Sequence, residues 1–146
     1  MLWRTHFLAG AAAGILLTGH ADFKTAALVG GIAGVAALLP DLDDPHSKLG
    51  RLVAPASWAI RAAVGHRGPL HSLLGAAVMS LLASFVLRFW YVHTHVYALQ
   101  WYNYSHLVPL IFAGYLSHLV MDSLNPQGVP WLWPVRRHFG LPLVRT

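Results

Sequence analysis

The chain has 146 residues, of which 56% are hydrophobic and only 10% are charged. A soluble domain usually carries about 25% charged residues, so the composition disfavours a soluble enzyme and favours one compact membrane-embedded unit. The formal net charge is +5, but the Lys and Arg residues stand singly between apolar segments, which excludes a nucleic-acid-binding surface. There is no cysteine, which excludes disulfides and thiolate metal sites.

Four apolar stretches follow one another along the chain. They predict an all-α, polytopic membrane protein, a single domain over residues 1–146, with spans near residues 7–22, 25–39, 72–92 and 107–122. A full span needs roughly 17–25 apolar residues, and only the third stretch meets that length outright. The other three must tilt, use their flanks or thin the bilayer. A soluble helical bundle is the alternative.

The first stretch has a second interpretation, as a signal peptide. Arg4 precedes an apolar run, and small residues follow it near Ala21. However, the run contains Gly10-xxx-Gly14, a spacing that lets membrane helices pack closely, and the second stretch repeats it with Gly30-xxx-Gly34. We therefore expect the first two helices to be retained and packed against each other.

The distribution of basic residues predicts the orientation. Positive charge is concentrated in cytoplasmic loops, and beyond Lys24 and Arg88 every basic residue falls on one side of the predicted spans. Arg88 can extend its guanidinium to the interface from its helix end. We therefore expect a multi-pass protein with both termini in the cytoplasm. The residues on the cytoplasmic side are Arg4, Lys48, Arg51, Arg61, Arg67, Arg136, Arg137 and Arg145.

The cytoplasmic connection between the second and third spans contains a further predicted helix. Asp44-Pro45 has the pattern of an N-cap followed by proline in the first turn. Apolar positions at helical spacing then predict an interfacial helix over residues 45–65. After the fourth span, residues 125–146 form a Pro/Trp-rich tail that cannot be a regular helix, and Trp131 and Trp133 are expected as interfacial anchors.

Seven ionisable side chains fall near the cytoplasmic ends of these elements, although the topology was drawn without them. Two of them, His118 and Asp122, are four residues apart and therefore share one face of a helix. Ionisable groups at membrane depth are costly and usually functional, so we expect these seven to form a metal site. They are His6, Asp41, Asp43, His66, His71, His118 and Asp122.

Imidazoles and carboxylates without thiolates suit a divalent metal, Zn²⁺ first and Mn²⁺ or Fe²⁺ as alternatives. Seven groups exceed the needs of one four-coordinate ion, which indicates either two ions or one ion with outer hydrogen-bonding partners. Asp44 is interpreted as a cap rather than a ligand, and Asp122 could instead cap the break before Asn125. The remaining histidines are interpreted as surface groups: His20, His46, His93, His95, His106 and His138.

The motifs Leu39-Pro-Asp-Leu-Asp43, Pro45-His-Ser-Lys-Leu-Gly-Arg51, His66-Arg-Gly-Pro-Leu-His-Ser72 and Gly114-Tyr-Leu-Ser-His-Leu-Val-Met-Asp122 resemble the YdjM-like family. These are bacterial inner-membrane proteins described as LexA-regulated, metal-dependent hydrolases. The resemblance runs from His6 to the Trp-Leu-Trp segment and implies that the seven His and Asp residues are the family's site residues. Many members have His where Asp44 stands, which would alter the ligand count. The helical HxxxD pair is also similar to the metal motif of zinc-dependent phospholipases C.

The resulting hypothesis is a metal-dependent hydrolase acting at the cytoplasmic membrane face on an amphiphilic phosphoester, such as a phospholipid or lipid-linked phosphate. Asp41 or Asp43 would bridge metals or act as general base, and Arg67 would hold an anionic substrate. Peptide hydrolysis is disfavoured because the chain has no HExxH motif and no glutamate. The alternative is a non-enzymatic membrane protein with a structural or transported metal, which would place its ligands nearer the bilayer midplane.

Overall fold

The computed structural model describes residues 2–19, 22–65, 68–94, 104–135 and 137–143. Within these ranges the protein is helical, with no named strand and one isolated bridge between Val129 and Phe139. The all-helical prediction is therefore confirmed for the described residues. The elements are α1 (Trp3–Thr18), α2 (Phe23–Ala36), the 3-10 turn η1 (Pro40–Asp43), α3 (Lys48–Leu52), α4 (Ala54–Val64), the 3-10 turn η2 (Pro69–His71), α5 (Leu73–Thr94) and α6 (Tyr104–Ser123).

The prediction of four membrane spans is not confirmed. Two segments of the described chain are long and apolar enough to cross a bilayer, Phe23–Asp43 and Leu73–Val92. Helix α1 has 16 residues, which at 1.5 Å per residue is about 24 Å and shorter than a hydrocarbon core of about 30 Å. Helix α6 has 20 residues, but its apolar run is interrupted by the histidines and the aspartate that its sequence carries.

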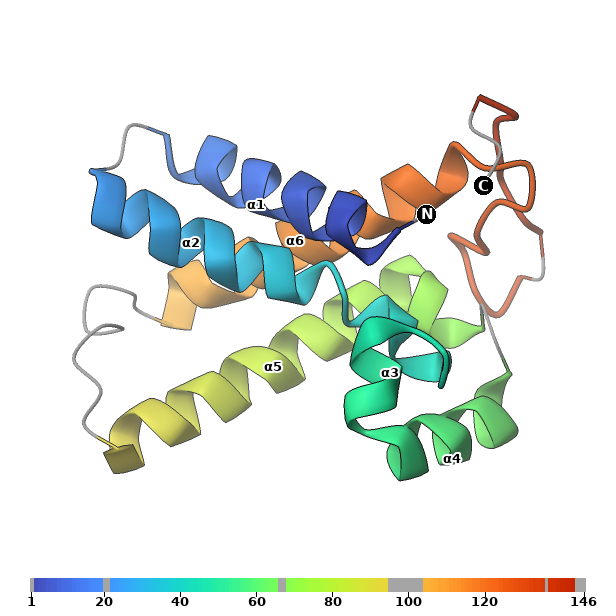
Figure 1. The fold of residues 1–146 in the computed structure, drawn as a ribbon, viewed down its shortest axis with the longest axis horizontal. Helices are drawn as coiled ribbons and strands as arrows, with labels where there is room; N and C mark the ends of the chain where they lie inside the picture. The colour runs from blue at the N-terminus through green and yellow to red at the C-terminus, as the bar shows by residue number, and fades with distance from the viewer. Residues whose placement is uncertain (1, 20–21, 66–67, 95–103, 136, 144–146) are drawn as a thin grey trace.

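Helices α1, α2 and α6 pack into one tight group, with α5 joined to it through α6 (Figure 1). The close approach depends on three glycines around Ala33 of α2. A Cβ on Gly10 would lie 2.5 Å from the Cβ of Ala37, and one on Gly14 would lie 2.5 Å from the Cβ of Ala33. A Cβ on Gly114 of α6 would meet the Ala33 carbonyl oxygen. The predicted packing of the first two helices through Gly10 and Gly14 is therefore confirmed.

Helix α5 diverges from this group and leaves most of its apolar surface uncovered. Only 22% of the residues in its membrane-length apolar stretch are buried, and large side chains such as Leu81, Phe85 and Phe89 are exposed. A soluble bundle would not leave a contiguous apolar surface of this kind in water. The surface of α5 therefore fits a bilayer better than the soluble alternative.

The segment expected as one interfacial helix over residues 45–65 forms two short helices. The first begins at Lys48, where Ser47 caps it by accepting the Gly50 amide at 2.8 Å. It ends at Leu52 because Pro55, near the start of α4, cannot donate a backbone hydrogen bond to the preceding turn.

The tail closes the end of the molecule where α5 begins and α6 ends. The Trp131 carbonyl accepts the Leu73 amide at 3.0 Å, and the Trp131 indole donates to Ser123 Oγ at 2.8 Å. Trp131 also packs against the cluster formed by Ala76, Tyr115 and Leu119. It is therefore a bridge between helices, whereas Trp133 is exposed.

Candidate metal centre

Six of the seven predicted ligands meet at the end of the bundle where α1 begins and α6 ends (Figure 1). His66 lies outside the described residues, and so does Arg67, the predicted anion-binding residue. The six come from four elements: His6 from the first turn of α1, Asp41 and Asp43 from η1, His71 from η2, and His118 and Asp122 from α6.

The fully buried His118 occupies the middle of this group. Its Nδ1 lies 2.8 Å from the carbonyl oxygen of Ala37. A carbonyl can only accept a hydrogen bond, so Nδ1 carries the proton and Nε2 presents its lone pair. The Ala37 carbonyl thus fixes both the orientation and the tautomer of the ring, as outer partners of metal-binding histidines do.

The Nε2 lone pair of His118 faces two carboxylates. Nε2 lies 3.7 Å from Asp41 Oδ1 and 3.7 Å from Asp122 Oδ2, and it has no hydrogen-bond partner among the described residues. Three acceptors directed at one point repel each other unless a cation lies between them. Donor atoms on a tetrahedral zinc ion are about 3.4 Å apart, so these spacings fit a metal site.

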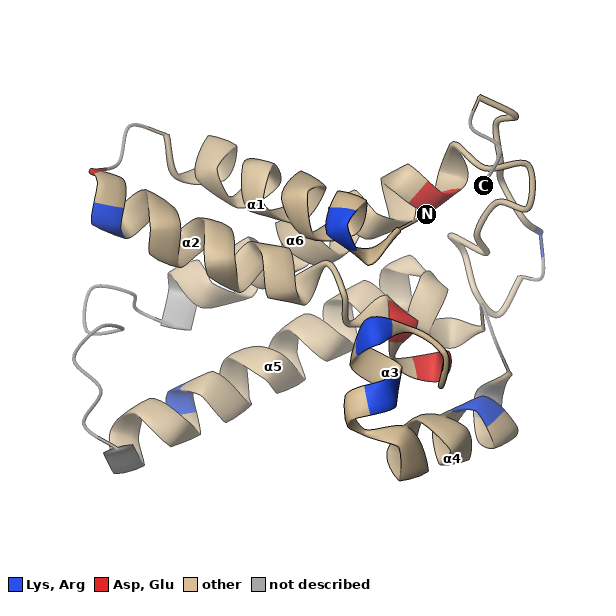
Figure 2. Cartoon of the chain, viewed as in Figure 1, with Lys and Arg blue, Asp and Glu red and all other residues tan. Residues whose placement is uncertain are grey.

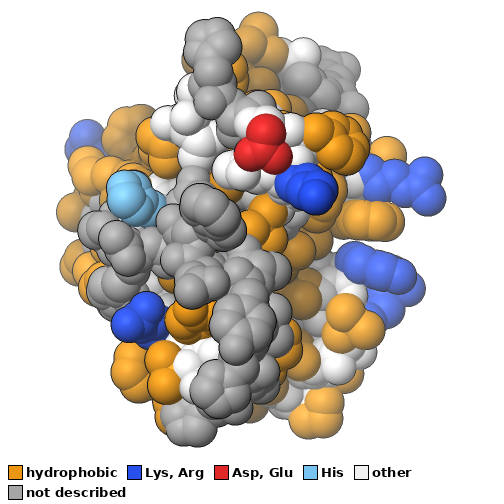
Figure 3. Space-filling model, turned by 90° about the vertical axis from the view of Figure 1, so that its left-hand side faces the viewer, with side chains coloured by type: hydrophobic (Ala, Val, Ile, Leu, Met, Phe, Trp, Pro, Cys, Tyr) orange, Lys and Arg blue, Asp and Glu red, His pale blue; other side chains and the backbone are white. Residues whose placement is uncertain are grey.

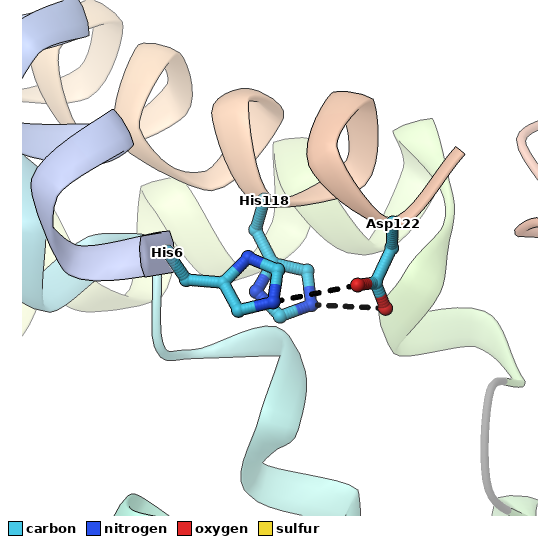
Figure 4. A group of neighbouring side chains, drawn as sticks. All are labelled: His6, His118 and Asp122. Atoms are coloured by element: carbon cyan, nitrogen blue, oxygen red, sulfur yellow. Dashed lines mark ion pairs between the residues drawn. The ribbon is translucent and has the colours of Figure 1, made fainter. Parts of the chain in front are cut away.

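His6 completes one side of the centre. Its ring stacks on that of His118, with centroids 3.9 Å apart and an interplanar angle of 23°. Its Nε2 lies 3.4 Å from Asp122 Oδ1, so the two carboxylate oxygens of Asp122 face one imidazole each (Figure 4). His6, His118 and Asp122 are all buried and form one group whose donor atoms lie within 4.8 Å of one another.

Asp41 and His71 complete the other side. Asp41 Oδ1 lies 4.0 Å from His71 Nε2, and with His118 they form a second group within 4.8 Å. His71 Nδ1 lies 3.3 Å from Asp43 Oδ2, on the side of the ring away from Asp41. Asp43 is fully buried. This arrangement gives Asp43 the position of a carboxylate that orients a metal-binding histidine rather than that of a ligand.

Both groups contain His118, which limits how many ions they can hold. The single lone pair of Nε2 can ligate one ion at a time. Of the two arrangements left open by the sequence, this geometry favours one ion beside His118 with outer partners over two ions that both use this histidine.

Backbone contacts hold the two turns that present the ligands. The Tyr115 hydroxyl donates to the Leu70 carbonyl, next to His71. Ser47 Oγ donates to the Asp41 carbonyl at 2.8 Å while it caps α3. Because these hydroxyls bond to the main chain, the positions of Asp41 and His71 depend on α6 and α3 as well as on their own turns.

The centre opens into a cleft of about 500 Å³, called here the polar cleft. Asp41, half-buried, lies at the boundary between the centre and this cleft. The sequence interpretation missed the basic part of the lining, because it treated Lys48 and Arg51 as loop charges and His46 as a surface group. The lining residues are Leu2, Trp3, His6, Asp41, Asp44, His46, Ser47, Lys48, Arg51, His71 and Asp122.

Asp44 is held in a turn and an ion pair. Its Oδ1 accepts the His46 amide at 3.1 Å and lies 3.3 Å from Arg61 Nη1. It belongs to neither group of potential metal ligands. The interpretation of Asp44 as a helix cap is wrong, because α3 begins at Lys48 and its N-cap is Ser47.

Comparisons with known proteins place the chain among bacterial inner membrane proteins. The model of the family described as "YdjM inner membrane protein" matches residues 1–146. Inner membrane protein YdjM of Escherichia coli (strain K12) is 43% identical over 107 residues, which cover 73% of this chain and 50% of that protein.

More distant relatives include YvsG of Bacillus subtilis (strain 168), 27% identical over 98% of this chain and 79% of that protein. Inner membrane protein YbcI of E. coli is 33% identical over 68% of this chain and 50% of that protein. The chain thus spans about half the length of YdjM and YbcI. No solved structure matches.

Proposed function

The chain belongs to the YdjM inner membrane protein family, and from that premise we propose that it is a membrane-bound, metal-dependent hydrolase of the bacterial inner membrane. Its substrate is an amphiphilic phosphoester, such as a phospholipid or a lipid-linked phosphate. The reaction takes place at the cytoplasmic face, and the metal is a single divalent ion, zinc before manganese or iron.

The observation that carries the proposal is the lone pair of His118 Nε2. It is buried, has no hydrogen-bond partner among the described residues, and lies between two carboxylates at 3.7 Å. Burying an unpartnered polar atom costs about 1–3 kcal/mol. A cation bound between His118 Nε2 and the two carboxylates would offset this cost. His6 and His71 are the further ligands within reach.

A divalent ion held there would lower the pKa of a bound water and polarise the scissile group. Two aspartates of the protein supply the general base and the orientation of a ligand. Asp41 is half-buried and reaches both the centre and the polar cleft, so in this proposal it is the general base, and the ligands are His6, His71, His118 and Asp122. Asp43 is buried behind His71, so it orients that imidazole.

The position of the site supports an amphiphilic substrate. The ligands gather at one end of the helices rather than at mid-length, unlike the midplane sites of transporters. Four basic residues belong to elements at this same end, Arg4 at the start of α1, Lys48 and Arg51 of α3 and Arg61 of α4, whereas the start of α2, with Lys24, lies at the other end (Figure 2). The opposite end carries a few charged side chains among hydrophobic ones (Figure 3). A substrate in the membrane would reach the site with its polar group at the basic end.

The test is hydrolysis of a panel of phospholipids and lipid phosphates by purified full-length protein in lipid nanodiscs, with and without added Zn²⁺ or Mn²⁺. We expect metal-dependent release of phosphate or of a phosphorylated headgroup. Asp41→Asn should lower turnover at least 100-fold, in the range typical of a lost general base. His138→Ala, which changes an exposed histidine, is the control. Bound metal without turnover on any of these lipids would favour the non-enzymatic alternative.

A further inference from the structure

The polar cleft contains two cations beside the metal centre. Lys48 and Arg51 are three residues apart on α3, and residues at this spacing are neighbours on one helix face. Both line the same cleft as His6, Asp41 and His71. The metal ligands and these two basic side chains therefore face one common volume.

In the part of the chain that the structure describes, no ion pair joins Lys48 or Arg51 to a carboxylate. Lys48 Nζ lies over the Trp3 ring, 5.9 Å from its centroid, a contact that attracts the ammonium but does not neutralise its charge. Asp44, the acid nearest to them in sequence, pairs with Arg61 at 3.3 Å. Arg51 Nε donates to the His46 carbonyl at 2.9 Å. That contact holds the guanidinium in place and leaves its two terminal nitrogens for a further partner.

The pair is also fixed in distance from the metal centre. Ser47 Oγ caps α3 and donates to the carbonyl of Asp41 at 2.8 Å, so the first turn of the helix is tied to the turn that bears Asp41 and Asp43. A Cβ on Gly50 would collide with the Asp44 carbonyl oxygen. Glycine at this position therefore lets α3 pack directly on the segment that follows η1.

We propose that Lys48 and Arg51 bind the phosphate group of the substrate and hold it against the metal centre. A planar guanidinium binds two phosphate oxygens at once, and an ammonium adds a point charge. Two cations that have no carboxylate partner among the described residues, beside a cation-binding centre, repel each other and the ion unless an anion of high charge lies among them. A terminal phosphate monoester carries about −1.5 to −2 charges at neutral pH. It is therefore a better fit than a phosphodiester, which carries one charge.

This inference rests on the proposed function for the role of the metal, but phosphate binding can be measured separately. The probe is inorganic phosphate, titrated calorimetrically into the full-length protein in detergent with Zn²⁺ or after chelation. We expect Lys48→Gln and Arg51→Gln each to weaken phosphate binding at least fivefold, and Arg51→Lys to weaken it as well because the two-point contact is lost. Zinc content should stay at the wild-type level in all three.

Arg88→Gln is the matched control, because it removes the same charge from α5 at the other end of the molecule. Phosphate affinity equal to that of the wild type in both Lys48→Gln and Arg51→Gln would overturn the inference and leave the metal proposal intact. Conversely, phosphate binding that depends on this pair in a protein that takes up no zinc would contradict the metal proposal alone.

A second arm distinguishes a lipid headgroup from free phosphate. The protein is placed in nanodiscs of phosphatidylcholine with or without phosphatidic acid, whose phosphate is a monoester. We expect phosphatidic acid to displace inorganic phosphate from the wild type, and not to change the residual binding of Arg51→Gln. Phosphate affinity that is the same in both lipid mixtures would overturn the assignment to a lipid monoester and favour a soluble phosphate compound.

Discussion

A single hydrogen bond determines what His118 can do. The Ala37 carbonyl fixes the proton on Nδ1, and Nε2 is therefore an acceptor that faces Asp41 and Asp122. Had the carbonyl been elsewhere, Nε2–H could donate to either carboxylate and the three residues would form an ordinary buried hydrogen-bond network. The position of this proton therefore favours a cation-binding group over a self-contained hydrogen-bond network.

Metal content should depend on the pair His118 and Asp122. We expect about one ion per wild-type chain. In the double variant His118→Ala, Asp122→Ala this content should fall at least tenfold, because only His6 would remain of the group His6, His118 and Asp122. Elemental analysis of purified protein measures the content, with His138→Ala as control. A folded double variant that keeps its metal would exclude these two residues as ligands.

Removal of the metal should also affect stability. The centre contains two carboxylates and three histidines in buried or half-buried positions, and a bound ion stabilises the folded state by its binding free energy. Chelation should lower the thermal midpoint of the wild type in detergent, and Zn²⁺ should restore it. The double variant should show the same midpoint with and without chelator.

Asp22, the N-cap of α2, makes a pH-dependent contribution to the stability of the fold. The Thr25 hydroxyl and the backbone amides of Thr25 and Lys24 donate to its carboxylate and hold the pKa of Asp22 below its ordinary value. A pKa lowered by folding means that the stabilisation is present above the unfolded pKa and is lost as the pH falls through the folded one. Asp22→Ala should therefore lower the thermal midpoint at pH 7, and this difference should shrink towards about pH 3.

At the scale of helices, the position of the centre follows from how closely three of them approach. Gly10 and Gly14 of α1 and Gly114 of α6 all contact α2 around Ala33. In a bilayer, helices associate through such close packing rather than through the hydrophobic effect. This contact brings the start of α1 and the end of α6 together beside η1, which places His6 next to His118.

Gly114→Ala should separate α6 from α2, because the added methyl group would collide with the Ala33 carbonyl, a backbone atom that cannot move aside alone. We expect a loss of about 1–3 kcal/mol of stability, measured as a lower thermal midpoint, together with weaker metal binding. Gly31→Ala is the matched control, since its Cβ would meet nothing within 4 Å. Equal midpoints for the two variants would contradict the packing argument.

Polar and basic groups are unevenly distributed along the length of the molecule. The candidate centre, the polar cleft and most of the described basic residues lie towards one end, whereas α5 ends and α6 begins at the other (Figures 1 and 2). The exposed apolar side chains of α5 lie between these ends. We therefore expect the basic end to face the cytoplasm, where the positive charge of membrane-protein loops is concentrated.

Reporter fusions test this orientation. A fusion after residue 146 should report the cytoplasm, and a fusion within residues 95–103 should report the periplasm, because an odd number of crossings separates the two positions in a four-span protein. A fusion in the segment between α2 and α3 should agree with that at residue 146. Reporting of the same side by the 95–103 and 146 fusions would exclude four spans and favour a topology with fewer crossings.

Local patterns in the sequence determined the helical class, the Gly10-xxx-Gly14 contact and the pairing of His118 with Asp122, because these depend on spacing within one or two helices. The tertiary structure decided the rest. That Ala37 fixes the tautomer of His118, that Asp43 lies behind His71, and that Lys48 and Arg51 face the ligands all depend on segments that are distant along the chain. Spacing cannot specify such contacts, since they arise only when three helices pack around Ala33 and bring their ends to one place.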